Sequence, residues 1–198
     1  LDLPDQVKTG LATYGHRRKG DCRDIELLIP VGHGMRNEIL DQVSGISPKG
    51  KTPIAASIQM VADGIKNVED ETIIILISDG EETCHPDPCG VVKNLKQSGA
   101  RFVLHVVGFD VDDNQRLQLE CLAKSGEGRY FTANDTASLT SAMTSVQAEV
   151  VQKVEKAKAV SRKVATRLGK LRITMPESAR ISLNTIKIIR AVDKKEVK

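Results

Sequence analysis

The chain has 198 residues, of which 40% are hydrophobic and 28% charged, and this ordinary globular composition excludes wholesale disorder. No stretch approaches the ~18 consecutive apolar residues that a transmembrane helix needs, so we expect none. The net charge of +3 is unevenly spread, because residues 151–198 carry 14 Lys/Arg against 4 Asp/Glu. We therefore expect that this basic region could contact an anionic surface. No aromatic residue interleaves its charges, so we expect no nucleic-acid partner.

The first half of the chain begins with two predicted strands, residues 7–16 and 24–31, which are close enough in sequence to form a hairpin. Residues 35–44 have a helical pattern, and a loop rich in Gly, Pro and Ser follows. Pro53 is well placed at the first position of another helix, whose apolar residues recur at helical spacing.

The clearest strand in the sequence is TIIILI at residues 72–77, which ends in Ser78-Asp79-Gly80. After it the pattern predicts the helix 90–97, the strand 101–108, the helix 114–124, the strand 128–132 and a long helix from 136 to about 168. Strands that alternate with helices indicate βαβ units and a parallel sheet. The expected fold class is α/β, with a doubly wound, mostly parallel sheet and helices on both faces.

The C-terminal region has a different pattern. Residues 170–175 and 185–192 are predicted as strands with no helix between them, like the start of a β-rich domain. The predicted organisation is therefore an α/β domain at 1–150, a helical linker at 151–169 and the beginning of a β-rich domain at 170–198.

One motif raises the hypothesis of an enzyme. GISPKGKT at residues 45–52 matches the P-loop pattern, and Asp79 at the end of IIILISD would serve as its second magnesium ligand. In a P-loop NTPase, Lys51 would reach the phosphates and Thr52 would hold Mg²⁺. Against this, the residues before Gly45 are polar and helical in period, whereas a P-loop follows a buried strand.

The cysteines and histidines give few catalytic options. Four cysteines are compatible with two disulfides, in any of three pairings: Cys22, Cys84, Cys89 and Cys121. A zinc site at Cys84, His85 and Cys89, with Cys121 brought in by the fold, has poor ligand spacing. His105 lies inside a predicted buried strand, and no histidine has a Ser or Cys partner for nucleophilic catalysis. We therefore expect a protein that is not an enzyme.

Several blocks in order carry a family resemblance: YGHRRKGDCRDIELLIPVG, PKGKTPIAASIQMVADGI, TIIILISDGEETCHPDPC and FVLHVVGFDV. Together, from Val7 to the helix that starts at Asp135, they resemble von Willebrand factor type A (vWA) domains of exported bacterial proteins. The resemblance implies a vWA/Rossmann-like fold and an extracytoplasmic location, whether periplasmic, secreted or at the cell surface. Export in turn favours disulfide bonding of the four cysteines.

The resemblance also implies a metal-ion-dependent adhesion site (MIDAS) at the carboxyl ends of the strands. Thr52 and Asp79 match two of its motifs and would bind Mg²⁺ or Mn²⁺, with an acidic side chain of a protein partner completing the metal shell. The third motif, D-x-S-x-S, does not occur in the sequence. We therefore expect that a central strand is missing and is supplied by a second chain or a segment before Leu1. A metal-free scaffold is the other interpretation.

Overall fold

The computed structural model describes residues 3–65, 72–168 and 185–190 and has a mixed α/β fold, as predicted. Its six strands are β1 (Lys8–Tyr14), β2 (Ile25–Gly32), β3 (Thr72–Ser78), β4 (Phe102–Phe109), β5 (Tyr130–Ala133) and β6 (Thr185–Arg190). Its helices are α1 (Arg36–Ser44), α2 (Ile54–Asp63), α3 (Pro88–Gln97), α4 (Asp113–Ser125) and α5 (Thr136–Leu168). The strands form one sheet in the order β2-β1-β6-β3-β4-β5.

The middle of the sheet is aliphatic because its strands are covered on both faces. In β3 and β4 nearly every residue is buried, and the two strands pair in parallel from Thr72 opposite Phe102 to Ser78 opposite Gly108. At one edge of the sheet β2 pairs antiparallel with β1, and only Ile29 among its residues is buried. The predicted hairpin is therefore confirmed.

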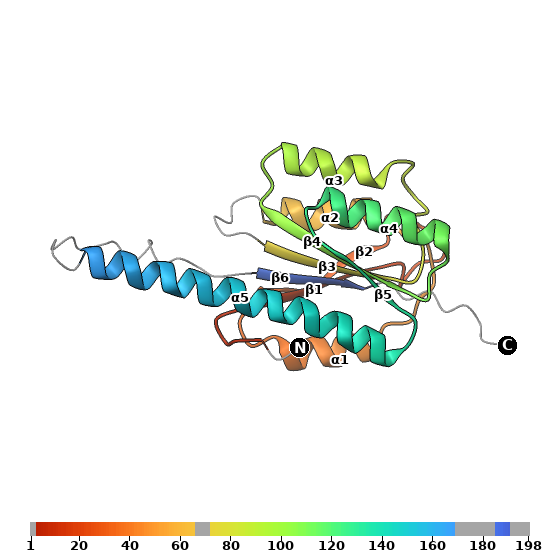
Figure 1. Ribbon diagram of the computed structural model, residues 1–198. Helices are drawn as coiled ribbons and strands as arrows, with labels where there is room; N and C mark the ends of the chain where they lie inside the picture. Colours follow the sequence, from red (N-terminus) through yellow and green to blue (C-terminus); the bar gives the residue numbers. More distant parts are fainter. Residues whose placement is uncertain (1–2, 66–71, 169–184, 191–198) are drawn as a thin grey trace.

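Helices lie on both faces of the sheet, with α2, α3 and α4 on one side and α1 and α5 on the other (Figure 1). Ile58 of α2, Val92 of α3 and Leu122 of α4 belong to the core on the first face. On the second face, α5 buries a stripe at every fourth position, namely Ala142, Val146, Val150 and Val154. By contrast, α1 has no buried residue.

The centre of the sheet differs from the expectation. β6 lies between β1 and β3 and is parallel to both, with Ile188 opposite Leu11 on one side and Ile75 on the other. We expected a second chain or a segment before Leu1 to supply the central strand, but β6 of this chain occupies that position. The strand predicted at 185–192 belongs to the main sheet and not to a second one. The strand predicted at 170–175 lies outside the described residues. Helix α5 continues without a break through residue 150, and the domain boundaries remain predictions.

Candidate functional site

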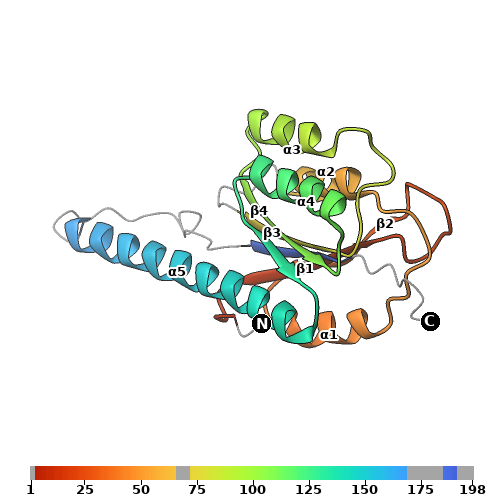
Figure 2. The same ribbon diagram turned by 45° about the vertical axis from the view of Figure 1, so that its right-hand side comes forward.

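The predicted site residues gather at the carboxyl edge of the sheet. Because β1 and β3 both run parallel to β6, their last residues, Tyr14 and Ser78, lie at the same edge. The β1–β2 hairpin and the segments leading into α2 and α3 meet at this end of the molecule (Figure 2). Open α/β sheets bind their ligands at such an edge.

Thr52 lies just before α2 and is only 4% exposed. Its backbone N–H donates to Thr83 Oγ1 (2.8 Å), and Thr83 N–H donates back to the Thr52 carbonyl (3.2 Å). These two bonds join the segment before α2 to the loop after β3, which carries Asp79. The helix begins at Ile54, with Pro53 as its N-cap. Pro53 therefore lies one residue before the first helical position, at which the sequence pattern placed it.

The N-terminus of α2 is capped by a residue from elsewhere in the chain. Glu82 is buried, and its Oε2 accepts the N–H of Ala55 at 2.7 Å. Its Oε1 accepts the N–H groups of Cys84 (2.7 Å) and His85 (3.2 Å). A carboxylate at this position satisfies otherwise unpaired donors and is stabilised by the helix dipole. Glu82 follows Glu81 in a polar loop, where a carboxylate is usually solvated, yet its side chain is buried.

Asp79 follows β3 directly and is partly exposed. The residue before it is fixed from both sides, because Tyr14 Oη donates to Ser78 Oγ (3.2 Å) and Ser78 Oγ donates to the Gly80 carbonyl (2.9 Å). Tyr14 and Ser78 are both buried. The backbone that carries Asp79 is therefore tied to β1 across the sheet, a link that sequence reasoning missed because 64 residues separate the partners.

The hairpin loop beside this edge has its own buried charge. Asp24 is fully buried and accepts the N–H groups of Arg17 and Arg18, each at 2.7 Å, and Arg17 Nε at 2.8 Å. Burial alone would raise the pKa of Asp24, but these hydrogen bonds outweigh it and hold the pKa below its usual range. At neutral pH the carboxylate is therefore ionised, and its hydrogen bonds join the two ends of the hairpin loop.

Two disulfides join these loops, in one of the three pairings that the sequence leaves open. Cys22 of the hairpin bonds to Cys84 of the loop after β3, with their Cα atoms 5.7 Å apart. Cys89 of α3 bonds to Cys121 of α4, with a Cα separation of 6.0 Å. With every cysteine paired, the zinc hypothesis loses its thiolate ligands. Two disulfides are typical of an oxidising, extracytoplasmic compartment.

The residues of this edge fit a divalent ion only in part. Thr52 and Asp79 offer two oxygen ligands, whereas Mg²⁺ takes six and keeps several waters. The carboxylate of Glu82 is already engaged by three N–H groups. Within the described part of the chain, no group of three or more His, Cys, Asp or Glu side chains could hold a metal. Most ligands would have to come from water and from a partner.

The segment 45–52 does not have the surroundings of a phosphate-binding loop. It leaves helix α1, with Gly45 as the C-cap, whereas a P-loop leaves a strand. The N–H groups of Lys49 and Gly50, which would face phosphates, both donate to the Gly15 carbonyl (2.7 and 3.0 Å). Gly15 has a φ of +63°, and an added Cβ there would clash with the Lys51 carbonyl. This segment is packed against the hairpin.

Comparisons with known proteins identify relatives of the chain but do not assign it to a family. No family model matches the chain. The uncharacterized protein YwmC of Bacillus subtilis (strain 168) is 29% identical over 140 residues, covering 66% of this chain and 61% of that protein. The uncharacterized protein YwmD of the same organism is 28% identical over 145 residues, covering 67% and 63%. The chain thus spans less than two thirds of the length of these curated relatives.

A solved structure is also similar, an uncharacterized membrane spanning protein from Vibrio fischeri. It has a TM-score of 0.36 and 19% identity, over 71% of this chain and 75% of that one. A similarity at this level supports neither a shared fold nor a shared function. In residues 3–65, 72–168 and 185–190, no helix combines the length and apolar character needed to cross a membrane.

Proposed function

We propose that this chain is a protein-interaction module of the vWA type, with a doubly wound sheet, working in the periplasm, as a secreted protein or at the cell surface. Its partner binds at the carboxyl edge, where an acidic side chain completes the shell of Mg²⁺ or Mn²⁺ held by Thr52 and Asp79. The ion supplies an electrophilic centre for that acidic group. The module binds without turnover.

The observation that supports this proposal is how firmly the two ligand-bearing segments are held together. Two hydrogen bonds join Thr52 to Thr83, one to the Thr83 hydroxyl and one to the Thr52 carbonyl; Glu82 caps α2, and the Cys22–Cys84 bridge links the hairpin to the same loop. A binding edge made rigid in advance loses little conformational entropy when a partner docks. No observation favours the NTPase alternative, and the metal-free scaffold is an outcome of the test below.

Thermal melting with EDTA, Mg²⁺, Mn²⁺ or Mg²⁺ plus ATP tests the proposal. An ion at a hundred times its dissociation constant stabilises the folded state by ~2.7 kcal/mol, which raises the midpoint by roughly 5–10 °C for a chain of this size. Asp79→Ala and Thr52→Ala should lose this rise. Asp41→Ala removes an exposed carboxylate from α1 and should keep it.

Each other outcome has a definite meaning. An equal rise in Asp79→Ala would place the ion elsewhere and contradict the proposal. No rise in the wild type would leave a metal-free scaffold, and a rise that depends on ATP would restore the P-loop hypothesis.

A further inference from the structure

A groove lies on the opposite side of the sheet from α2, α3 and α4, between α5 and the start of β5. This groove has a volume of about 430 Å³, within the range of small-ligand sites. The polar side chains that line it are Arg129, Ser145, Glu149, Gln152, Lys153 and Lys156. Three are cationic and one is anionic, so the groove carries an excess positive charge.

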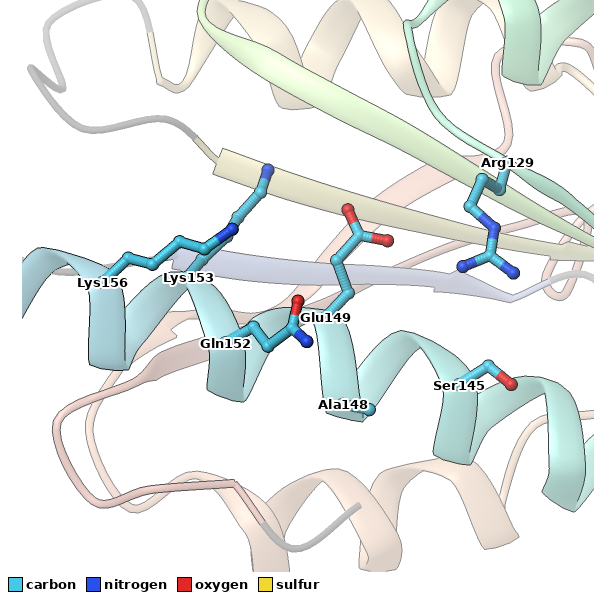
Figure 3. A pocket seen from close by; sticks show the side chains of 7 residues that line it. All are labelled: Arg129, Ser145, Ala148, Glu149, Gln152, Lys153 and Lys156. Atoms are coloured by element: carbon cyan, nitrogen blue, oxygen red, sulfur yellow. The ribbon is translucent and has the colours of Figure 1, made fainter.

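Figure 3 shows how these charges are arranged. The carboxylate of Glu149 lies between the guanidinium of Arg129 on one side and the ammonium groups of Lys153 and Lys156 on the other. Arg129 is held in place, because its guanidinium stacks over the Phe131 ring at 4.8 Å and its backbone N–H donates to His105 Nδ1 at 3.1 Å. One cation is therefore held in place, and the other two are lysine ammonium groups at the ends of four-carbon stems.

An unsatisfied buried donor lies next to two of the residues that line the groove, Arg129 and Glu149. Because Nδ1 of His105 accepts the Arg129 N–H, the proton of the neutral ring is on Nε2. His105 is 1% exposed, and its Nε2 has no hydrogen-bond partner. Glu149 Oε1 is 3.4 Å from this nitrogen, beyond the usual hydrogen-bond length of 2.9–3.0 Å. Such a buried orphan group calls for a physical explanation.

We propose that the groove binds a ligand with a phosphate group, whose negative charge is taken by Arg129, Lys153 and Lys156. An anion among these cations repels Glu149 towards the sheet. There Glu149 accepts the Nε2–H of His105, a bond that the structure has nearly formed. The orphan donor is thus satisfied when the ligand is bound. This site is independent of the carboxyl edge and of the function proposed for it.

Inorganic phosphate is the first probe, added to the ¹⁵N-labelled chain and followed by NMR. Phosphate should shift the Arg129 resonances and raise the pKa of His105, because Glu149 approaches the ring and an anion sits nearby. Lys153→Gln with Lys156→Gln should weaken phosphate binding at least about tenfold, which corresponds to ~1.4 kcal/mol for lost charge-assisted bonds.

A matched control removes the same charge from the other face. Lys93→Gln with Lys124→Gln alters exposed lysines of α3 and α4 and should change the affinity less than about twofold. Equal losses in the two double variants would overturn the proposal, because binding would then follow net charge alone.

Vesicles of phosphatidylglycerol separate a lipid headgroup from a free ligand as the source of the phosphate. If the groove variant loses vesicle binding and the control variant keeps it, the ligand is a lipid headgroup. This conclusion holds even if free phosphate binds weakly. If neither phosphate nor vesicles bind in a groove-dependent way, the proposal is wrong.

Discussion

The ring of His105 is a buried group whose charge depends on pH. Burial lowers the pKa of His105, nearby Lys153 and Arg129 lower it further, and Glu149 opposes them without reversing the net effect. The unfolded chain therefore binds a proton at a higher pH than the folded chain does. The resulting contribution to stability is complete above the unfolded pKa of about 6.5 and is lost as the pH falls towards the folded value.

His105→Gln tests this argument, because glutamine cannot take up a proton. The free energy of unfolding of the wild type should fall below pH ~6.5 by up to ~1.4 kcal/mol per pH unit more than that of the variant. Urea denaturation from pH 8 to pH 5 measures both. Parallel pH profiles for the two proteins would show that His105 is not responsible.

Glu82 is the residue whose role was least visible in the sequence. It follows another glutamate in a polar loop, and only the folded chain brings it to the N-terminus of α2, 27 residues earlier. A carboxylate on a loop is usually solvated, so sequence pattern favours the wrong answer. Here three backbone donors compensate its burial, and those donors become neighbours only through tertiary packing.

At the scale of elements, the disulfides hold together parts that are distant in the chain. Cys22 and Cys84 are 62 residues apart, and Cys89 and Cys121 are 32 apart. In the chain-entropy account a bridge acts mainly by restricting the unfolded chain, so the longer loop gives the larger effect.

Cys22→Ser with Cys84→Ser should lower the free energy of unfolding by about 4 kcal/mol. Cys89→Ser with Cys121→Ser should cost about half a kcal/mol less, because its loop is half as long. Guanidinium denaturation under non-reducing conditions compares the two. An unchanged midpoint in the first variant would mean that Cys22 and Cys84 contribute nothing to stability.

Sequence pattern was most reliable where local signals and burial agree. The aliphatic runs of β3 and β4 and the long helical period of α5 fixed their type and, to within about two residues, their ends. The disulfide pairing could not be predicted, since it depends on which loops meet at one edge. The sequence placed Thr52 and Asp79 in loops, but the Thr83 and Tyr14 contacts that fix those loops are long-range.

β6 is the element that pattern alone misplaced. The sequence predicts a strand at 185–192, but strand order within a sheet is not encoded in local periodicity. Its neighbours β1 and β3 are more than 100 residues earlier in the chain. The expectation that a central strand is missing from the first part of the chain was correct. The expectation that another chain or segment supplies it was wrong, because β6 of this chain lies there.

At the scale of the whole molecule, β6 alone connects the β1–β2 pair to the β3–β4–β5 group within the sheet. A central strand bonds to both neighbours, so proline within it removes a ladder hydrogen bond and is not tolerated. Ile188→Pro should lower the free energy of unfolding by on the order of 3 kcal/mol or more.

Ile188→Val is the matched control, because it keeps the backbone N–H and a β-branched residue; we expect a much smaller loss than for the proline variant. Circular dichroism during thermal unfolding distinguishes the two variants. A proline variant as stable as the valine variant would contradict the central position of β6.

The two disulfides also decide how the molecule carries mechanical load. When the chain is pulled at positions before Cys22 and after Cys121, tension passes from Cys22 through sulfur to Cys84, and then from Cys89 to Cys121. The stretches 23–83 and 90–120, which include β3 and β4, lie outside this path and cannot be drawn out while the bridges are intact. The force acts on β1, β5, α5 and β6 instead. Under tension, the oxidised protein should therefore unfold first where β6 pairs with β1 and β3.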